Sequence, residues 1–366
     1  MKIFFRLKNF MKFYKYKRVS RNRISSLKRE DLTELHRNIS PDIITMENFQ
    51  SFISDLDIDD LIKYPEIEPL VEQIGQLHEI NKNCILVTSG IDGGLKTVFE
   101  MCTADNDSVA TYFPTYAMYK VYSEAYNVNL IDININGEDT KKEIYNAINK
   151  NISILFLPNP NLPVEFGLSQ NDISKICVEA RKKEVLVVID EAYAMFGLDT
   201  VIPLMSKHDN LIIARTFSKA IGFPGIRLGY LIANSNLIEY LESRRNAHET
   251  NALSISAGRW AINNFSIVKS NIDKVIETRE WFKQELIKNK ISAIGMYSNT
   301  VILDLNNKDT ADKFTEFMKD QGYIVKNNYP SVYHGFVSIT IGTKDLMIRV
   351  MNSIKIFLEL NNDKFK

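Results

Sequence analysis

The sequence predicts an α/β protein with two domains: a large domain with a doubly wound, mostly parallel sheet, and a smaller α+β domain built from N- and C-terminal segments. Residues 84–233 alternate short β-rich runs with helical patterns, which is typical of a parallel sheet covered by helices on both faces. Strand patterns crowd together over 184–233, which indicates a local antiparallel or crossing strand. Beyond residue 235 helical patterns dominate, and three further strand patterns predict the smaller domain.

The elements of the large domain follow from short apolar runs and from the helical periodicity between them. Runs rich in apolar and β-branched residues predict strands at 84–88, 108–112, 127–131, 152–157, 185–190, 210–216 and 228–233. Apolar residues at helical spacing predict helices near 92–103, 115–126, 139–149 and 170–182. The carboxyl ends of the parallel strands are then the expected place for a ligand.

The smaller domain is predicted from the C-terminal part of the chain. A long helical pattern near 267–288 is followed by strands at 300–305, 323–326 and 337–341 and by helices near 309–321 and 344–360. The predicted organisation is a basic extension at 1–30, an N-terminal segment at 31–60 that packs with the smaller domain, a large domain at 61–265 and a smaller C-terminal domain at 266–366.

Composition argues against several classes of function. The 366 residues include 45 Lys and Arg and 45 Asp and Glu, so no overall basic charge favours nucleic acid. No apolar run approaches the roughly 18 residues of a membrane span. Three widely spaced cysteines predict a reducing compartment, the cytoplasm, and no metal site.

The N-terminal extension at 1–30 is rich in Lys and Arg and carries a single acid, Glu30. It has no continuous apolar stretch, which argues against a secretory signal. It could contact an anionic surface or form a solvated extension. The second interpretation is favoured, because blocks of like charge are usually solvated.

The segment that carries the most chemistry ends at Lys219. This lysine follows the predicted strand 210–216 and is preceded by Thr216 and Ser218, and Arg227 follows eight residues later among glycines. A lysine can form a Schiff base with the aldehyde of pyridoxal phosphate. The two hydroxyls and the guanidinium are suited to bind the phosphate of such a cofactor.

Asp190 and Tyr193 follow the buried-type strand 185–190. A carboxylate at this place can pair with a protonated pyridine nitrogen, and the tyrosine can donate to the oxygen on the same ring. In isolation the pair would more simply be a helix-capping aspartate and a half-buried tyrosine. The lysine segment downstream favours the cofactor interpretation.

Three turns after predicted strands complete the candidate site. The turn Ser89–Gly94 includes Gly90, Ile91 and Asp92 and opens a helix, whose N-terminus can bind an anion. Tyr116 lies after the strand 108–112 and either stacks on a flat ring or belongs to the core. Asn161 lies in a turn rich in Asn and Pro at the same edge of the sheet.

The order of these motifs resembles that of a known enzyme family. Over about residues 35–360 the chain resembles fold-type I pyridoxal-phosphate enzymes, in the branch with histidinol-phosphate aminotransferase and threonine-phosphate decarboxylase. The matching motifs are Tyr64-Pro65, Ser89-Gly90-Ile91-Asp92, Pro114-Thr115-Tyr116, Asn159-Pro160-Asn161, Asp190-Glu191-Ala192-Tyr193, Thr216-Phe217-Ser218-Lys219, Arg227 and Ile339-Thr340-Ile341-Gly342-Thr343.

The resemblance implies a role for each matching residue. Lys219 would hold the cofactor and move the proton, with Asp190 at the ring nitrogen, Tyr193 at the ring oxygen and Tyr116 on the ring face. The phosphate would be bound by the turn at Gly90, Ile91 and Asp92 and by Thr216, Ser218 and Arg227. Tyr64 would reach the phosphate from a neighbouring subunit, which implies a homodimer with shared active sites.

Two positions depart from the family pattern. Leu162 stands where relatives usually carry an asparagine that binds the ring oxygen, and Asn161 could take over that role. Ser338 stands where the family has an arginine that clamps the substrate α-carboxylate. Either another cation replaces that arginine, with Arg37 and Lys326 as candidates, or one substrate lacks such a carboxylate.

Three hypotheses for the reaction remain open. The leading hypothesis is an aminotransferase that acts on a small phosphorylated ketone or amine, such as dihydroxyacetone phosphate, with an amino acid as donor. The second is a decarboxylase of an O-phosphorylated amino acid, phosphoserine or phosphothreonine. The third is a cofactor-binding protein without turnover, and the presence of Lys219, Asp190 and Arg227 argues against it.

Overall fold

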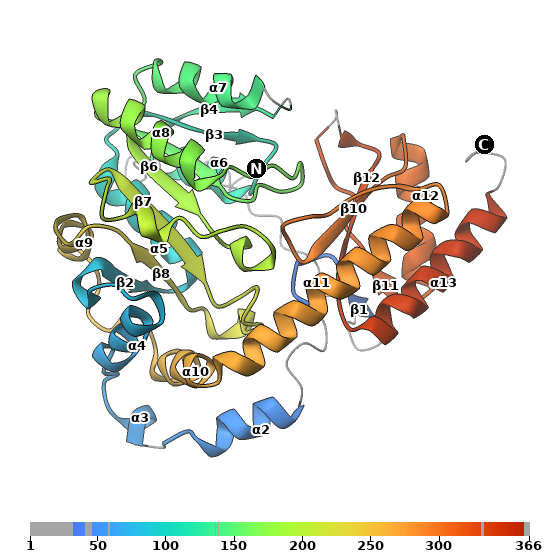
Figure 1. Cartoon of the computed structure of the whole chain (residues 1–366), viewed down its shortest axis with the longest axis horizontal. Helices are drawn as coiled ribbons and strands as arrows, with labels where there is room; N and C mark the ends of the chain where they lie inside the picture. The colour runs from blue at the N-terminus through green and yellow to red at the C-terminus, as the bar shows by residue number, and fades with distance from the viewer. Residues whose placement is uncertain are drawn as a thin grey trace, which may run out of the picture.

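The computed structural model describes residues 32–40, 46–57, 59–135, 137, 139–330 and 333–361. The basic extension expected at 1–30 therefore lies outside the described residues. The described part of the chain has a larger domain around a seven-stranded sheet, and a smaller domain with a three-stranded sheet (Figure 1). None of the described helices is both long and apolar enough to span a membrane.

The seven-stranded sheet confirms the predicted mostly parallel fold. Its strands are β2 (Ile85–Thr88), β3 (Ser108–Phe113), β4 (Asn129–Asn134), β5 (Ile154–Pro158), β6 (Leu186–Asp190), β7 (Leu211–Thr216) and β8 (Gly229–Ile232), in the order β2-β8-β7-β6-β5-β3-β4. Only β8 runs antiparallel to its neighbours, β2 and β7. The crowding of strand patterns over 184–233 thus predicted the antiparallel strand correctly.

Helices cover both faces of this sheet because successive side chains of a buried strand point to opposite sides. In β5, Leu155 and Leu157 join one hydrophobic cluster, and Ile154 and Phe156 join the other. The first cluster includes α4 (Glu68–His78), α7 (Asp139–Ile148), α8 (Gln170–Lys182) and α10 (Ala252–Asn263). The second includes α5 (Gly90–Cys102), α6 (Met118–Ala125) and α9 (Ser235–Glu242).

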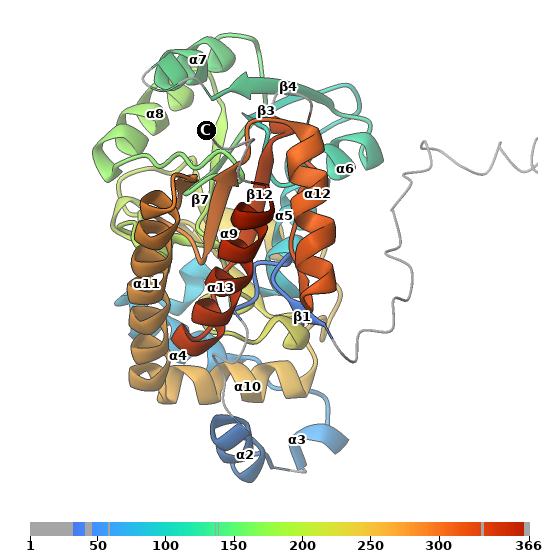
Figure 2. The same ribbon diagram turned by 90° about the vertical axis from the view of Figure 1, so that its right-hand side faces the viewer.

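The smaller domain begins with the long helix α11 (Phe265–Lys288), which runs from the large domain into it (Figure 1). It continues with β9 (Ser292–Ile294), β10 (Thr300–Asp304), α12 (Lys308–Asp320), β11 (Tyr323–Ile324), β12 (Phe336–Thr340) and α13 (Lys344–Leu360). The order β12-β10-β9 forms the antiparallel sheet. Figure 2 shows α11, α13 and α12 side by side on the side turned away from the large domain.

The structure divides residues 31–60, which were expected to pack with the smaller domain. The strand β1 (Thr33–Glu34) pairs with β11 of that domain. The helix α2 (Met46–Ser54) packs on the large domain instead, where the Phe52 ring lies 6.2 Å from Phe223 and 6.3 Å from Trp260. The short helix α3 (Asp59–Ile62) contacts α10 of the large domain as well.

Candidate active site

A cavity of about 1,020 Å³ lies between the two domains. Its floor includes the last residues of four strands of the large sheet, Phe113, Pro158, Asp190 and Thr216. Its opposite wall comes from β10 and β12 of the smaller domain and from the N-terminal residues 37–39. A ligand site at the carboxyl ends of parallel strands is the arrangement expected for an open α/β sheet.

Most of the residues singled out from the sequence meet in this cavity. Its lining includes Arg37, Ile91, Asp92, Tyr116, Asp190, Tyr193, Thr216, Ser218, Lys219, Arg227, Lys326 and Ser338. Gly90 lies directly behind Arg227, since an added Cβ on this glycine would lie 2.8 Å from the guanidinium Nη2. Asn161 and Tyr64 do not line the cavity.

One end of the cavity is suited to bind a phosphate. The helix α5 starts at Gly90 and directs the positive end of its dipole toward the cavity. Arg227 lies beside it, with Nη2 3.2 Å from the Asp92 carboxylate, and Tyr116 donates to the same carboxylate at 2.8 Å. The close contact between β8 and the start of α5 requires Gly229, because a Cβ there would lie 2.6 Å from the Gly90 carbonyl carbon.

Further along the cavity lies the buried carboxylate of Asp190. It accepts a hydrogen bond from the Tyr119 hydroxyl at 2.8 Å and one from the Ala192 N–H at 3.0 Å. Burial raises the pKa of Asp190 to about 6, because the ionised form has lost its water. A cation placed against this carboxylate would favour the ionised form, and a protonated pyridine nitrogen is such a cation.

Lys219 lies between the two domains. Its ammonium donates to the backbone carbonyl of Arg37 at 3.1 Å and lies 5.6 Å from the centroid of the Tyr193 ring. The Tyr193 hydroxyl in turn accepts a hydrogen bond from the Asn38 amide at 2.8 Å. Asn38 is itself held by the smaller domain, since its N–H donates to Thr340 Oγ1 at 3.1 Å.

The donor set fits pyridoxal phosphate. The start of α5 and Arg227 can hold the phosphate, Asp190 can face the ring nitrogen, and Lys219 can reach the aldehyde from beside Tyr193. At the end of the cavity suited to phosphate, Gly90 and Gly229 leave space only for backbone atoms. Backbone N–H groups can therefore come close to a bound phosphate.

Comparison with known proteins decides the family. The family model for aminotransferase class I and II matches residues 41–354. The chain belongs to this family. Its membership confirms the resemblance found in the sequence and the predicted α/β fold. The chain is therefore an aminotransferase that uses pyridoxal phosphate.

Curated relatives and solved structures agree with this membership. The aminotransferase is 32% identical over 309 residues to the histidinol-phosphate aminotransferase of Brachyspira hyodysenteriae, covering 82% of this chain and 85% of the relative. The Pyrococcus furiosus enzyme of the same name is 27% identical over 333 residues, covering 89% and 92%.

Two solved structures show the same fold at lower identity. The histidinol-phosphate aminotransferase of Sinorhizobium meliloti, in complex with pyridoxal-5'-phosphate, matches with a TM-score of 0.81 at 18% identity over 91% of this chain and 94% of its own. The L-threonine-O-3-phosphate decarboxylase of Porphyromonas gingivalis matches with a TM-score of 0.76 at 20% identity over 90% and 100%.

In the turn after β5, the side-chain amide of Asn161 is not available to bind a ligand in the cavity. The Asn161 side chain donates to the carbonyls of Pro114 at 3.0 Å and Val164 at 2.8 Å, and Leu162 faces the cavity instead. Both amide hydrogens of Asn161 are therefore used within the wall of the cavity. The cofactor-binding role expected for Asn161 has no support in this geometry.

Three cavity residues were missed in the sequence. Tyr119 binds Asp190, Asn38 binds Tyr193, and Tyr329 donates to the Ser338 hydroxyl at 2.6 Å. Tyr119 follows Tyr116 at a helical spacing of three, a signal that could have placed both on one side of the helix predicted at 115–126. The sequence around Asn38 and Tyr329 does not indicate their contacts. Tyr193 lies 155 residues from Asn38, and Ser338, the partner of Tyr329, lies in β12.

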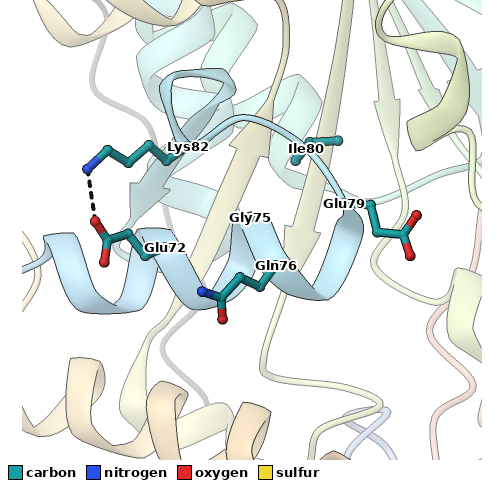
Figure 3. A pocket seen from close by; sticks show the side chains of 6 residues that line it. All are labelled: Glu72, Gly75, Gln76, Glu79, Ile80 and Lys82. Atoms are coloured by element: carbon teal, nitrogen blue, oxygen red, sulfur yellow. Dashed lines mark hydrogen bonds and ion pairs between the residues drawn. The ribbon is translucent and has the colours of Figure 1, made fainter.

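A second hollow, of about 380 Å³, lies on the surface at the C-terminal end of α4 (Figure 3). Among the described residues that line it, Lys82 is the one cation, and its ammonium lies 2.9 Å from Glu72 and 3.5 Å from Glu68. Because this charge is already balanced, and because the hollow lies away from the strand ends, it is not a second candidate site for the aminotransferase.

Proposed function

We propose that this aminotransferase moves an amino group between an amino acid and a small phosphorylated ketone or amine. The observation that carries the proposal is the joint presence of Lys219, Asp190 and an anion site in one cavity. Two more cations, Arg37 and Lys326, line the same cavity and can receive a second anionic group. Relatives named for histidinol phosphate support a phosphate-bearing substrate of this size.

The proposed roles of the residues follow from their positions. When bound, pyridoxal phosphate stabilises the negative charge that develops when a bond next to the substrate nitrogen is broken. Lys219 would hold the cofactor and move the proton to and from the substrate carbon. Asp190 would keep a positive charge on the ring nitrogen, and Tyr193 would donate to the ring oxygen. Tyr116 would cover the ring, and the phosphate would be bound by Gly90, Ile91, Asp92, Thr216, Ser218 and Arg227.

A decarboxylase of phosphoserine or phosphothreonine is the second candidate. It is favoured by Ser338, which lacks the guanidinium that would hold a substrate carboxylate in the plane of the ring. A carboxylate that is lost must stand out of this plane, so a decarboxylase does not need the arginine in that position.

Spectroscopy of the cofactor-loaded enzyme separates the candidates. The enzyme is incubated separately with glutamate, histidinol phosphate, phosphoserine and phosphothreonine, while the cofactor spectrum and CO₂ are followed. Amino transfer predicts that glutamate and the phosphorylated amine each convert the cofactor to its amine form without CO₂. Release of CO₂ from phosphoserine or phosphothreonine would instead establish the decarboxylase, and no spectral response to any amine would establish a protein without turnover.

We further propose that the enzyme acts as a homodimer. Leu61, Ile62 and Tyr64 expose 50%, 73% and 80% of their surface, respectively. Exposed apolar side chains close together are typical of a contact with another subunit. The Tyr64 ring stacks on His248 at 4.6 Å between centroids, on the outside of the chain. The proposed role of Tyr64 is to leave this stack and reach the phosphate end of a partner's cavity.

Mixing two variants tests this sharing of Tyr64. Tyr64→Phe is expected to weaken cofactor binding roughly tenfold, since it removes one hydrogen bond to a charged group. Dimers with one Tyr64→Phe and one Lys219→Ala subunit, isolated by their different tags, should show about half of the wild-type activity at limiting cofactor concentration, because one site is unaltered and the other lacks both residues. Hybrids that are no more active than the Tyr64→Phe subunits alone would place Tyr64 outside the partner's site.

The proposed location is the cytoplasm. Cys84, Cys102 and Cys177 are all free thiols, as expected in a reducing compartment.

A further inference from the structure

Lys326 and Ser338 lie directly opposite each other across two antiparallel chain segments. The Lys326 N–H donates to the Ser338 carbonyl at 3.2 Å, and the Ser338 N–H donates to the Lys326 carbonyl at 2.8 Å. Residues opposed in this way direct their side chains to the same face of the pair, with Cβ atoms about 5 Å apart. Lys326 therefore projects beside the position where the family pattern has the carboxylate-binding arginine.

Ser338 itself cannot bind a substrate carboxylate. Its side chain is buried, with 3% of the residue exposed, and its hydroxyl accepts the Tyr329 hydrogen at 2.6 Å. Tyr329 thus fills the space around the short serine side chain. A hydroxyl pair of this kind carries no charge, so it cannot replace a guanidinium.

Lys326 supplies the positive charge instead. Its ammonium lies 5.0 Å from the centroid of the Tyr329 ring, and its side chain lines the cavity and reaches water through it. Among the described residues, no acidic side chain forms an ion pair with it. Arg37 differs in this respect, because Glu34 lies 3.5 Å from its guanidinium.

No carboxylate among the described residues balances the charge on Lys326. Partial withdrawal from water, and then the charge of Lys219, lower the pKa of Lys326 from its usual value. A carboxylate between these two lysines would reduce their repulsion and restore the lost solvation. This face of the cavity is therefore prepared for an anion that arrives with the substrate.

We propose that Lys326 binds the α-carboxylate of the amino-acid donor, in the place that Ser338 leaves without a cation. The inference rests on the proposed amino transfer. It also weakens the case for decarboxylation, because a cation that holds the carboxylate is present although the arginine is not. As a point charge, Lys326 fixes the direction of the carboxylate less strictly than a bidentate arginine does.

The test compares two amines on the cofactor-loaded enzyme, one with a carboxylate and one without. Lys326→Met removes the charge and keeps the apolar stem. It should raise the apparent Kd for glutamate, measured from the cofactor spectrum in the first half-reaction, by roughly tenfold or more. The apparent Kd for histidinol, an amine with neither a carboxylate nor a phosphate, should stay within about twofold. Lys326→Arg should retain glutamate binding.

Lys120→Met is the matched control, because it removes the same charge from the α6 wall of the same cavity. It should leave glutamate binding unchanged. Unaltered glutamate binding in Lys326→Met, or an equal loss for histidinol, would overturn the carboxylate assignment while amino transfer stands. If the unaltered enzyme itself shows no response to glutamate, the proposed amino transfer fails, and the inference fails with it.

Discussion

Lys219→Ala should abolish covalent binding of pyridoxal phosphate and lower the rate of amino transfer on the order of 10⁴-fold. Lys219 is the only amine placed against both Tyr193 and the end of β7 among the described residues of the cavity. No other amine among the described residues of the cavity lies where it could form the covalent bond or transfer the proton. Borohydride reduction followed by peptide mass spectrometry measures the attachment directly.

Lys326 is the control for the site of covalent attachment. It is a second lysine of the same cavity, and the positive charge of Lys219 acts on it. Reduced cofactor found on Lys326 in the unaltered enzyme, or found at wild-type yield in Lys219→Ala, would contradict the assignment. Circular dichroism of the variant should match that of the unaltered chain, because within the described part of the chain the Lys219 side chain makes one hydrogen bond, to the Arg37 carbonyl.

Asp190→Asn should lower the rate of amino transfer by about 10²- to 10³-fold, the range found when one preorganised electrostatic group is removed. Asparagine has nearly the same shape but no negative charge, so a protonated ring nitrogen loses its counter-ion. The steady-state rate at saturating glutamate measures the effect. A variant with the full rate would show that the ring nitrogen does not need a charge.

The same substitution has a signature in the cofactor-free chain. The pKa of Asp190 is 3.8 in the reference state and about 6 in the fold, so the folded protein holds this proton more tightly. The stabilising contribution of the protonated carboxyl is complete below pH 3.8 and is lost as the pH rises through about 6. The loss is on the order of 3 kcal/mol.

Asp190→Asn removes this titration. The free energy of unfolding of the variant should therefore rise relative to the unaltered cofactor-free chain between about pH 4 and 7. Denaturant titrations at several pH values measure the difference. If the free energy of unfolding of the two proteins changed with pH in the same way, burial would not hold Asp190 in its protonated form.

The larger domain was predictable because its strands are continuous apolar runs with strong local signals. The β5 and β6 strands, for example, were expected at 152–157 and 185–190 and lie at Ile154–Pro158 and Leu186–Asp190. The strands β1 and β9 were not expected. Each has only two or three residues, and β1 is defined by its pairing with Tyr323 and Ile324 at the other end of the chain.

The candidate site was predictable where its residues follow strands, because strand ends share one edge of the sheet. This placed Asp190, Thr216 and Lys219 together before any contact was known. The opposite wall was not predictable in the same way. The relation between Lys326 and Ser338 depends on a pairing of two segments, and Asn38 reaches Tyr193 across 155 residues of chain. Sequence periodicity carries no information about such pairings.

The hydrogen bonds of residues 35–38 have a consequence for the nascent chain. The Leu35 carbonyl accepts hydrogen bonds from Thr340, and Asn38 binds the same threonine across 302 residues of sequence. Asn38 therefore leaves the ribosome 302 residues before Thr340. The wall of the cavity beside Lys219 is therefore completed only after Thr340 has been made, when all strands of the large domain have already emerged.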